Sequence, residues 1–140
     1  MIEVSPRLRR PDMPVSRRDL ETLLAGALDV LGLTGKTLSL RVVTDQEMEA
    51  LNRAYLGLPG PTNVLSFPLD DPGQPDCLGD MAISADTVAR EAFLYGQTPR
   101  RHFVRLLCHG ILHLAGVDHG PEMFELTDKA VEAVAVVADA

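Results

Sequence analysis

The sequence predicts an α+β fold, in which a small mixed β-sheet packs against several helices, one of them central and buried. Three observations lead to this prediction. Apolar residues recur at helical spacing in several segments, they alternate with polar residues over 37–43, and the segment 99–114 is apolar on most of its sides. A chain of 140 residues is long enough for a hydrophobic core. We therefore expect residues 1–140 to form a single domain.

The N-terminal segment predicts one strand followed by one helix. Ile2–Val4 is short and apolar, as expected of an edge strand, and the Arg- and Pro-rich stretch after it is typical of a loop. Ser16 followed by Asp19 resembles the start of a helix closed by a capping box. The helix should continue to Gly32, with a buried stripe made of Leu20, Leu23, Leu24, Ala27, Leu28 and Leu31.

The next segment predicts a second strand and a second helix. From Thr37 the pattern changes to period two, which places Leu38, Leu40 and Val42 on one face of a strand. Thr44 with Glu47 then forms a capping box for a helix. The apolar residues expected on the buried side of this helix are Met48, Leu51 and Tyr55, with Leu56 at the margin.

Two further strands are predicted at 64–69 and around 78–84, separated by an acidic, Pro-rich loop. A loop of this length favours a hairpin, and therefore an antiparallel pair. The earlier strands are joined through helices and should be parallel. The sheet is therefore expected to be mixed.

The C-terminal half predicts three helices. The first runs from about Asp86 to Tyr95, and the last opens at Pro121. Between them, Thr98 followed by Pro99 starts a helix well, with a capping side chain and then Pro at the first helical position. This helix should be the central, buried one, because its apolar residues surround it: Phe103, Val104, Leu106, Leu107, Ile111, Leu112 and Leu114.

Composition narrows the class of protein. Cys77 and Cys108 form no CxxC motif, so we expect a reducing cytoplasm and no disulfides. The first residues contain no apolar segment, and the apolar stretch 131–138 is too short to cross a membrane. The net charge of −7 disfavours phosphate binding. Two clusters of arginine offset this charge locally, one over residues 7–18 and one over residues 100–105 of the central helix.

The motif HxxxHxxxxxH, from His109 to His119, contains three of the four histidines. Residues four apart lie on one face of a helix, so His109 and His113 can aim two imidazoles at one point. Gly116 can turn the chain and bring His119 to the same point. Three imidazoles with no obvious fourth protein ligand describe a catalytic zinc site that keeps one position for water. His102 lies two turns earlier, roughly 10 Å along the axis, so we expect it at the surface or supporting the ligands.

The same motif excludes a close alternative. The metzincin pattern HExxHxxGxxH fits except at its second position, where the general-base Glu of those peptidases is replaced by Gly110. The metal alone does not identify the substrate class, because bound zinc can catalyse amide hydrolysis and phosphodiester hydrolysis equally well. Asp118, beside the third histidine, is a candidate proton acceptor, and equally a candidate turn residue.

Three segments resemble the YbeY family of bacterial endoribonucleases and ribosomal RNA maturation factors. HGILHLAGVDH from His109 is similar to the family's HGxLHLxGYDH, LNRAYLGLPGPTNVLSFP from Leu51 to LNxxYRxxDxPTDVLSFP, and LGDMAIS from Leu78 to LGDIxIS. The resemblance implies a zinc-binding α+β fold with His109, His113 and His119 as ligands. It also implies a metal-dependent endoribonuclease that acts on ribosomal RNA precursors and the small ribosomal subunit, with neither a membrane nor DNA as partner.

Among the positions where the sequence departs from the family pattern, two matter for function: Leu56 stands where the family has Arg, and Asn63 where it has Asp. The family's Arg is its usual phosphate-binding or catalytic cation. Arg53, three residues earlier on the same helix, is a candidate replacement, and equally a solvent-facing side chain. Arg105, on the helix of the histidines, is a second candidate for substrate binding.

Three hypotheses about function follow from these residues. The first is a zinc-dependent endoribonuclease that cuts single-stranded regions of ribosomal RNA precursors. The second is a ribosome-assembly factor that binds RNA and uses the metal mainly for structure; Leu56 and the acidic balance favour it. The third is a metallohydrolase of another class, such as a peptidase with its base drawn from elsewhere.

Overall fold

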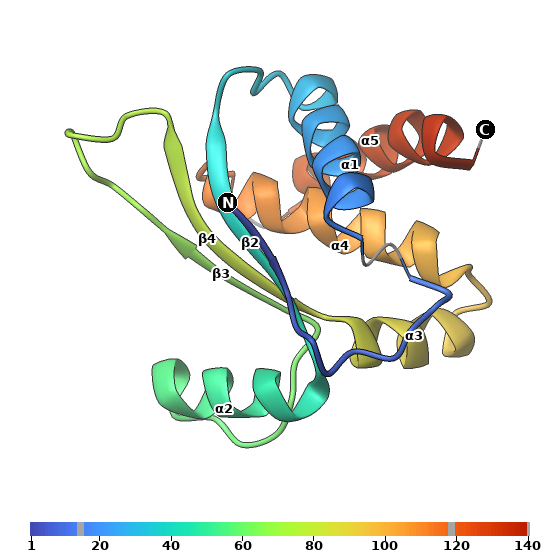
Figure 1. Ribbon diagram of the computed structural model, residues 1–140. Coiled ribbons are helices and arrows are strands. Elements are labelled where there is room, and N and C mark those ends of the chain that lie inside the picture. Colours follow the sequence, from blue (N-terminus) through green and yellow to red (C-terminus); the bar gives the residue numbers. More distant parts are fainter. Residues whose placement is uncertain (14–15, 118–119, 140) are drawn as a thin grey trace.

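The computed structural model describes residues 1–13, 16–117 and 120–139, with side chains described as far as Val134 in the last helix (Figure 1). Strands and helices alternate over the first half of the chain, and helices make up the C-terminal part. In chain order the elements are β1 (Ile2–Val4), α1 (Arg17–Val30), β2 (Thr37–Val43), α2 (Asp45–Leu56), β3 (Val64–Pro68), β4 (Cys77–Ser84), α3 (Ala85–Leu94), α4 (Pro99–Leu114) and α5 (Pro121–Asp139).

The strands form one mixed sheet in the order β1-β2-β4-β3. β1 pairs with β2 and β2 with β4 in parallel, whereas β3 and β4 form the expected antiparallel hairpin. The α+β fold with a mixed sheet is thus confirmed. The rule that helix-joined strands run parallel fails for β3, because β4 inserts between β2 and β3 and leaves β3 antiparallel at the edge.

Helices cover the two faces of the sheet unequally (Figure 1). α1 and α4 lie on one face, with α5 packed outside them, and α2 lies alone on the other. The alternation along β2 matches this arrangement: Leu38, Leu40 and Val42 belong to the main core, and Val43 packs with Met48 beneath α2. Among the described residues, no helix is both long and apolar enough to cross a membrane.

α4 is the central helix, as expected. Its N-terminus is held by Thr98, whose Oγ1 accepts a hydrogen bond from the Arg101 backbone N–H at 3.2 Å, and Pro99 occupies the first turn. The helix contacts α1, α3, α5 and the strands β3 and β4. Its buried residues include all seven apolar positions predicted from the sequence: Phe103, Val104, Leu106, Leu107, Ile111, Leu112 and Leu114.

The other predicted caps are also confirmed. Ser16 Oγ accepts from the Asp19 N–H at 3.1 Å. Thr44 and Glu47 form the full capping box, in which Thr44 Oγ1 accepts from the Glu47 N–H at 3.2 Å and the Thr44 N–H donates to Glu47 Oε1 at 3.0 Å. These local hydrogen bonds fix where α1 and α2 begin.

The predicted buried stripe of α2 is wrong at its C-terminal end. Met48 is fully buried, but Tyr55 is 66% exposed and Leu56 is 51% exposed. α2 ends at Gly57, which adopts the left-handed conformation with φ of 66°. Only the N-terminal part of the helix is sealed against the sheet, so its last turn borders open space.

Candidate functional site

His109 and His113 lie on one face of α4, near its C-terminal end. His109 is half-buried and His113 is exposed, whereas the neighbouring Cys108 and Ile111 are in the core. The helix ends at Leu114, and Gly116 takes the left-handed conformation with φ of 85°, as the motif predicts. Core packing therefore fixes the backbone of α4 while two imidazoles reach the surface together.

The rest of the predicted centre cannot be placed, because Asp118 and His119 lie outside the described residues. Within 1–13, 16–117 and 120–139, no group of three or more His, Cys, Asp or Glu residues is arranged to hold a metal ion. The His109 and His113 pair is the donor type and spacing that zinc takes from a helix, so the described part of the site fits the ion. The three-histidine set stays a prediction.

Gly110 lets α4 lie directly on the sheet. A Cβ atom at this position would be 2.8 Å from both Sδ and Cε of Met81 and 3.3 Å from Oγ of Ser66. Met81 is in β4 and Ser66 in β3, so the close approach spans the two strands of the hairpin. A glutamate at 110 would point into this contact and not toward the surface that carries His113. A peptidase-type general base at this position would have to displace the end of the Met81 side chain.

Cys108 is not a ligand candidate. The side chain is fully buried in the main core, and this burial raises the pKa of the thiol to about 12. The side chain therefore does not reach the surface that carries the histidines. Cys108 is thus a small core residue.

His102 is only 5% exposed, so of the two alternatives expected for it the surface position is wrong, and the supporting role stays a prediction. Its Nε2 lies 3.1 Å from Oε1 of Glu91 on α3, and its ring meets the edge of Tyr95. Glu91 also accepts from the amide of Asn63, with Nδ2–Oε1 and Nδ2–Oε2 distances of 3.1 and 3.4 Å. The half-buried Asn63 and Glu91 and the buried His102 form a trio that ties the residue before β3 to α3 and α4.

This trio accounts for one departure from the family pattern. Asn63 supplies an N–H donor that faces the Glu91 carboxylate. An aspartate at the same position would set two carboxylates against each other at hydrogen-bond distance, which disfavours the ionisation of both. The amide at 63 is therefore matched to its partner on α3.

The two candidate substrate-binding arginines are both engaged with acidic side chains. Arg105 Nη1 is 2.5 Å from Asp128 Oδ1 on α5, and one turn earlier Arg101 pairs with Glu132. Arg53 Nη2 is 3.0 Å from Glu49 Oε1 within α2, which lies on the sheet face opposite α4. Their roles in substrate binding stay predictions, and any phosphate they bind must compete with these carboxylates.

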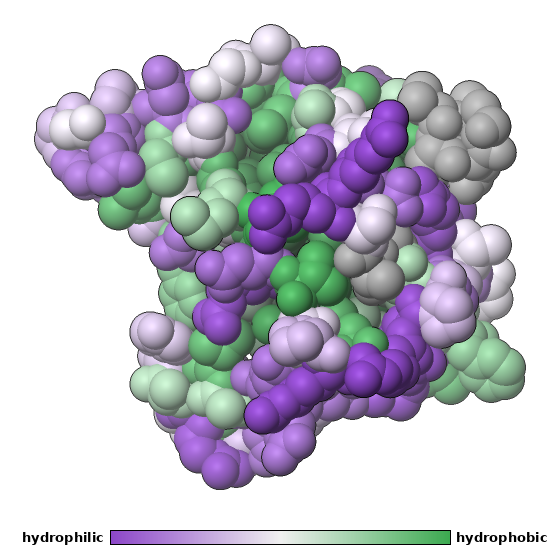
Figure 2. Space-filling model, in the orientation of Figure 1, coloured by the Kyte–Doolittle hydropathy of each residue, from purple (hydrophilic) through white to green (hydrophobic). Residues whose placement is uncertain are grey.

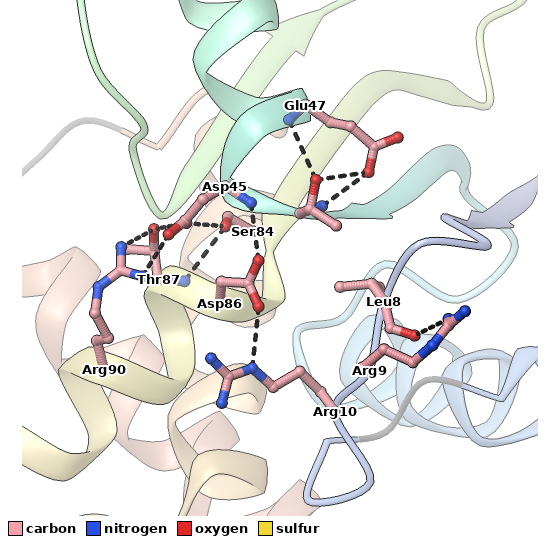
Figure 3. Close-up of polar contacts among 10 residues, drawn as sticks. Leu8, Arg9, Arg10, Asp45, Glu47, Ser84, Asp86, Thr87 and Arg90 are labelled. Atoms are coloured by element: carbon pink, nitrogen blue, oxygen red, sulfur yellow. Dashed lines mark hydrogen bonds and ion pairs between the residues drawn. The ribbon is translucent and has the colours of Figure 1, made fainter.

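A second polar cluster, centred on Asp45, joins α2 to α3 (Figure 3). Asp45 Oδ1 accepts from Ser84 Oγ at 2.8 Å and from Thr87 Oγ1 at 2.6 Å, and Oδ2 pairs with Arg90. Burial opposes ionisation of this carboxyl, but the hydrogen bonds from Arg90, Thr87 and Ser84 outweigh burial and lower the pKa of Asp45. Sequence reasoning missed this cluster, because Asp45 lies 39 to 45 residues before its partners Ser84, Thr87 and Arg90.

A cavity of about 500 Å³ opens between the last turns of α2 and the sheet. Its walls include Leu51 and Tyr55 from α2 and Phe67 from β3. Figure 2 shows the molecule narrowed at the left between the β3–β4 connection above and α2 below, with apolar surface at this waist. The cavity is on the sheet face opposite α4, and sequence reasoning missed it by treating Tyr55 as buried.

Comparison with known proteins gives a consistent result over most of the chain. A family model described as "Endoribonuclease YbeY" matches residues 10–134. A protein of that name from Oleidesulfovibrio alaskensis is 42% identical over 85% of this chain and 83% of its own. Another from Nitratidesulfovibrio vulgaris is 38% identical over 86% of each chain. The solution structure of TM1509 from Thermotoga maritima is similar, with a TM-score of 0.68 and 26% identity, over 100% of this chain and 96% of that one.

Proposed function

The chain belongs to the YbeY family of endoribonucleases, and we propose that it cuts single-stranded regions of ribosomal RNA precursors with the help of one zinc ion. The proposed role includes maturation and quality control of the small ribosomal subunit in the cytoplasm. The observation that carries the proposal is the pair His109 and His113, which share one face of a helix whose other sides are buried.

The proposed centre uses His109, His113 and His119 as ligands, with a water in the remaining position. Zinc in such a site lowers the pKa of its bound water to about 7 and polarises a phosphoryl oxygen. The contribution of the chain is to hold the imidazoles fixed through the packing of α4, and to supply a proton acceptor, for which Asp118 is the candidate. A rigid ligand helix keeps the open position aimed at the substrate.

Gly110 makes a peptidase the weaker alternative. The base of a metzincin would stand at this position, where its Cβ would meet the end of the buried Met81 side chain and Ser66. An assembly factor with a mainly structural metal is the stronger alternative. It is favoured by Leu56 at the family's arginine position and by the acidic partners of Arg53 and Arg105.

The first experiment compares cleavage of a small-subunit RNA precursor by the wild type, by His113→Ala and by Lys129→Ala, purified side by side. Lys129 is an exposed cation of α5, so its removal controls for handling and for loss of a surface charge. We expect the wild type and Lys129→Ala to cut unpaired regions and His113→Ala to be inactive. Metal analysis should find about one zinc per chain in the wild type and less in His113→Ala.

The other outcomes are equally informative. Equal cleavage by all three proteins would indicate a contaminating nuclease and refute the proposed site. RNA binding without cleavage in any of them would favour the assembly factor. Chelator-sensitive digestion of casein would favour the peptidase.

A further inference from the structure

We propose that the cavity beneath α2 binds one unstacked nucleobase of the RNA substrate, and that it favours guanine over uracil. This inference rests on the proposed function and assigns a specificity subsite to it. The cavity is about 500 Å³, ample for a single base with part of its ribose, and it is formed entirely by described residues.

The walls of the cavity suit a flat aromatic ligand. Tyr55 and Phe67 face each other with ring centroids 5.2 Å apart and planes tilted by 49°. Tyr55 is largely exposed although it stands on the apolar side of α2, next to Leu51. Unpaired bases of single-stranded RNA are commonly held by stacking on such rings. Tyr55, which is exposed at the mouth of the cavity, can provide such a stacking surface.

The polar side of the cavity offers a hydrogen-bond acceptor to a base. Asp80 lies across from Ser39 in the β2–β4 register, and both line the cavity. No hydrogen bond or ion pair joins the Asp80 carboxylate to another described residue. Arg41 on this wall is 3.6 Å from Glu3, and Met1, whose N-terminal amino group donates to the Leu38 carbonyl at 3.2 Å, lines the cavity as well. The Asp80 carboxylate is therefore available to accept hydrogen bonds from a base.

Asp80 also determines which base the cavity prefers. A carboxylate has only acceptors, so it pairs with N–H groups. Guanine presents N1–H and its N2 amino group side by side, which matches the two carboxylate oxygens. Uracil presents carbonyl oxygens beside its single N–H and would face the carboxylate with like partial charge. Phe67 and Asp80 are opposite each other in the hairpin, so the stacking wall and the carboxylate are adjacent.

The cavity is within reach of a strand bound at α4, because only the edge strand β3 separates them. Side chains alternate along β3. Phe67 points into the cavity, and its neighbour Ser66 points to Gly110 on α4. An RNA strand that passes over this edge can place one base in the cavity while its backbone continues toward His113. The waist in Figure 2 is the surface it would follow.

The test uses guanosine and uridine 5′-monophosphates, which contain no internucleotide bond to cut. Each is titrated into the zinc-loaded, isotope-labelled full chain and followed by backbone amide NMR. We expect guanosine monophosphate to shift the amides of Ser39, Tyr55 and Asp80 saturably, and uridine monophosphate to bind about ten-fold more weakly. Tyr55→Ala should weaken guanosine monophosphate about ten-fold, and Tyr55→Phe should keep its affinity because the ring is retained.

Matched variants control for surface effects. Tyr95→Ala removes an exposed ring on α3, and Asp76→Asn removes an exposed carboxylate outside the cavity. Neither should change affinity, whereas Asp80→Asn should reduce the preference for guanine. Shifts elsewhere on the molecule, no saturable shift, or a Tyr55→Ala protein that binds like the wild type would overturn the proposal.

The same variants separate the subsite from the proposed activity. On the RNA precursor, Tyr55→Ala should raise KM with kcat nearly unchanged. A wild type that binds guanosine monophosphate in the cavity but cuts no RNA would refute the endoribonuclease and retain the base site. Cleavage that is unaffected by Tyr55→Ala, at all substrate concentrations, would refute the base site and retain the endoribonuclease.

Discussion

Gly110→Glu would complete the sequence HExxH, and we expect it to destabilise the protein without creating a peptidase. The new side chain begins 2.8 Å from Met81, which is itself fully buried between α4 and the sheet. Overpacking costs about 1–3 kcal/mol, and burial of an unpaired polar carboxyl adds about 3 kcal/mol. The sum of about 4–6 kcal/mol is a large part of the roughly 5–15 kcal/mol that stabilises a typical domain. Urea unfolding followed by circular dichroism, with chelator present, measures this loss.

Gly26→Glu is the matched control. Gly26 also lies within a helix, α1, but a Cβ there meets no atom within 4 Å. Replacement of a helical glycine should stabilise by up to about 1 kcal/mol. If Gly110→Glu unfolds within about 1 kcal/mol of the wild type, α4 does not rest on the hairpin at this residue. If that variant digests casein with zinc, the argument against a peptidase is also wrong.

Three further predictions concern stability, each measured by urea unfolding. Thr98→Ala should lower the free energy of unfolding by about 1 kcal/mol through loss of the α4 cap, and Thr98→Ser should not. Asp45→Ala should cost about 1.5–3 kcal/mol at pH 7. Because the pKa of Asp45 is lowered in the folded state, its stabilisation exists above the unfolded-state pKa, and the difference from wild type should vanish as the pH falls through the folded value. Asn63→Asp should cost about 1–3 kcal/mol at pH 8, because two carboxylates then meet, and less at pH 5, where they can share a proton; equal costs at both pH values would contradict this.

The features that the sequence predicted well depend on residues close together in the chain. Ser16, Thr44 and Thr98 cap helices through hydrogen bonds to the backbone N–H three residues later, so a few letters suffice to locate them. The shared face of His109 and His113 follows in the same way from a spacing of four on one helix. Periodicity also identified α4 as the buried helix, because its apolar residues surround it.

The features that were missed depend on distant segments. The position of β3 at the edge depends on β4 pairing with β2, about 40 residues earlier. Tyr55 fits an apolar stripe, and only the gap between α2 and the sheet leaves it exposed. The sequence left His102 either at the surface or supporting the ligands, because its partner Glu91 belongs to a different helix, α3. The third histidine and Asp118 lie outside the described residues, so the full centre rests on the motif.

The edge position of β3 also bears on aggregation. Leu69 N–H donates inward to Leu78, so by alternation the N–H groups of 64, 66 and 68 face outward. The Val64 N–H donates to Oδ1 of Asn63 at 2.7 Å, and Pro68 has no backbone N–H group. Among the outward-facing residues of this described strand, only Ser66 then has a backbone N–H available to a strand of another chain. Such an edge is a poor template for pairing with a strand of another chain. The β3–β4 hairpin can therefore keep an exposed edge without forming intermolecular sheets.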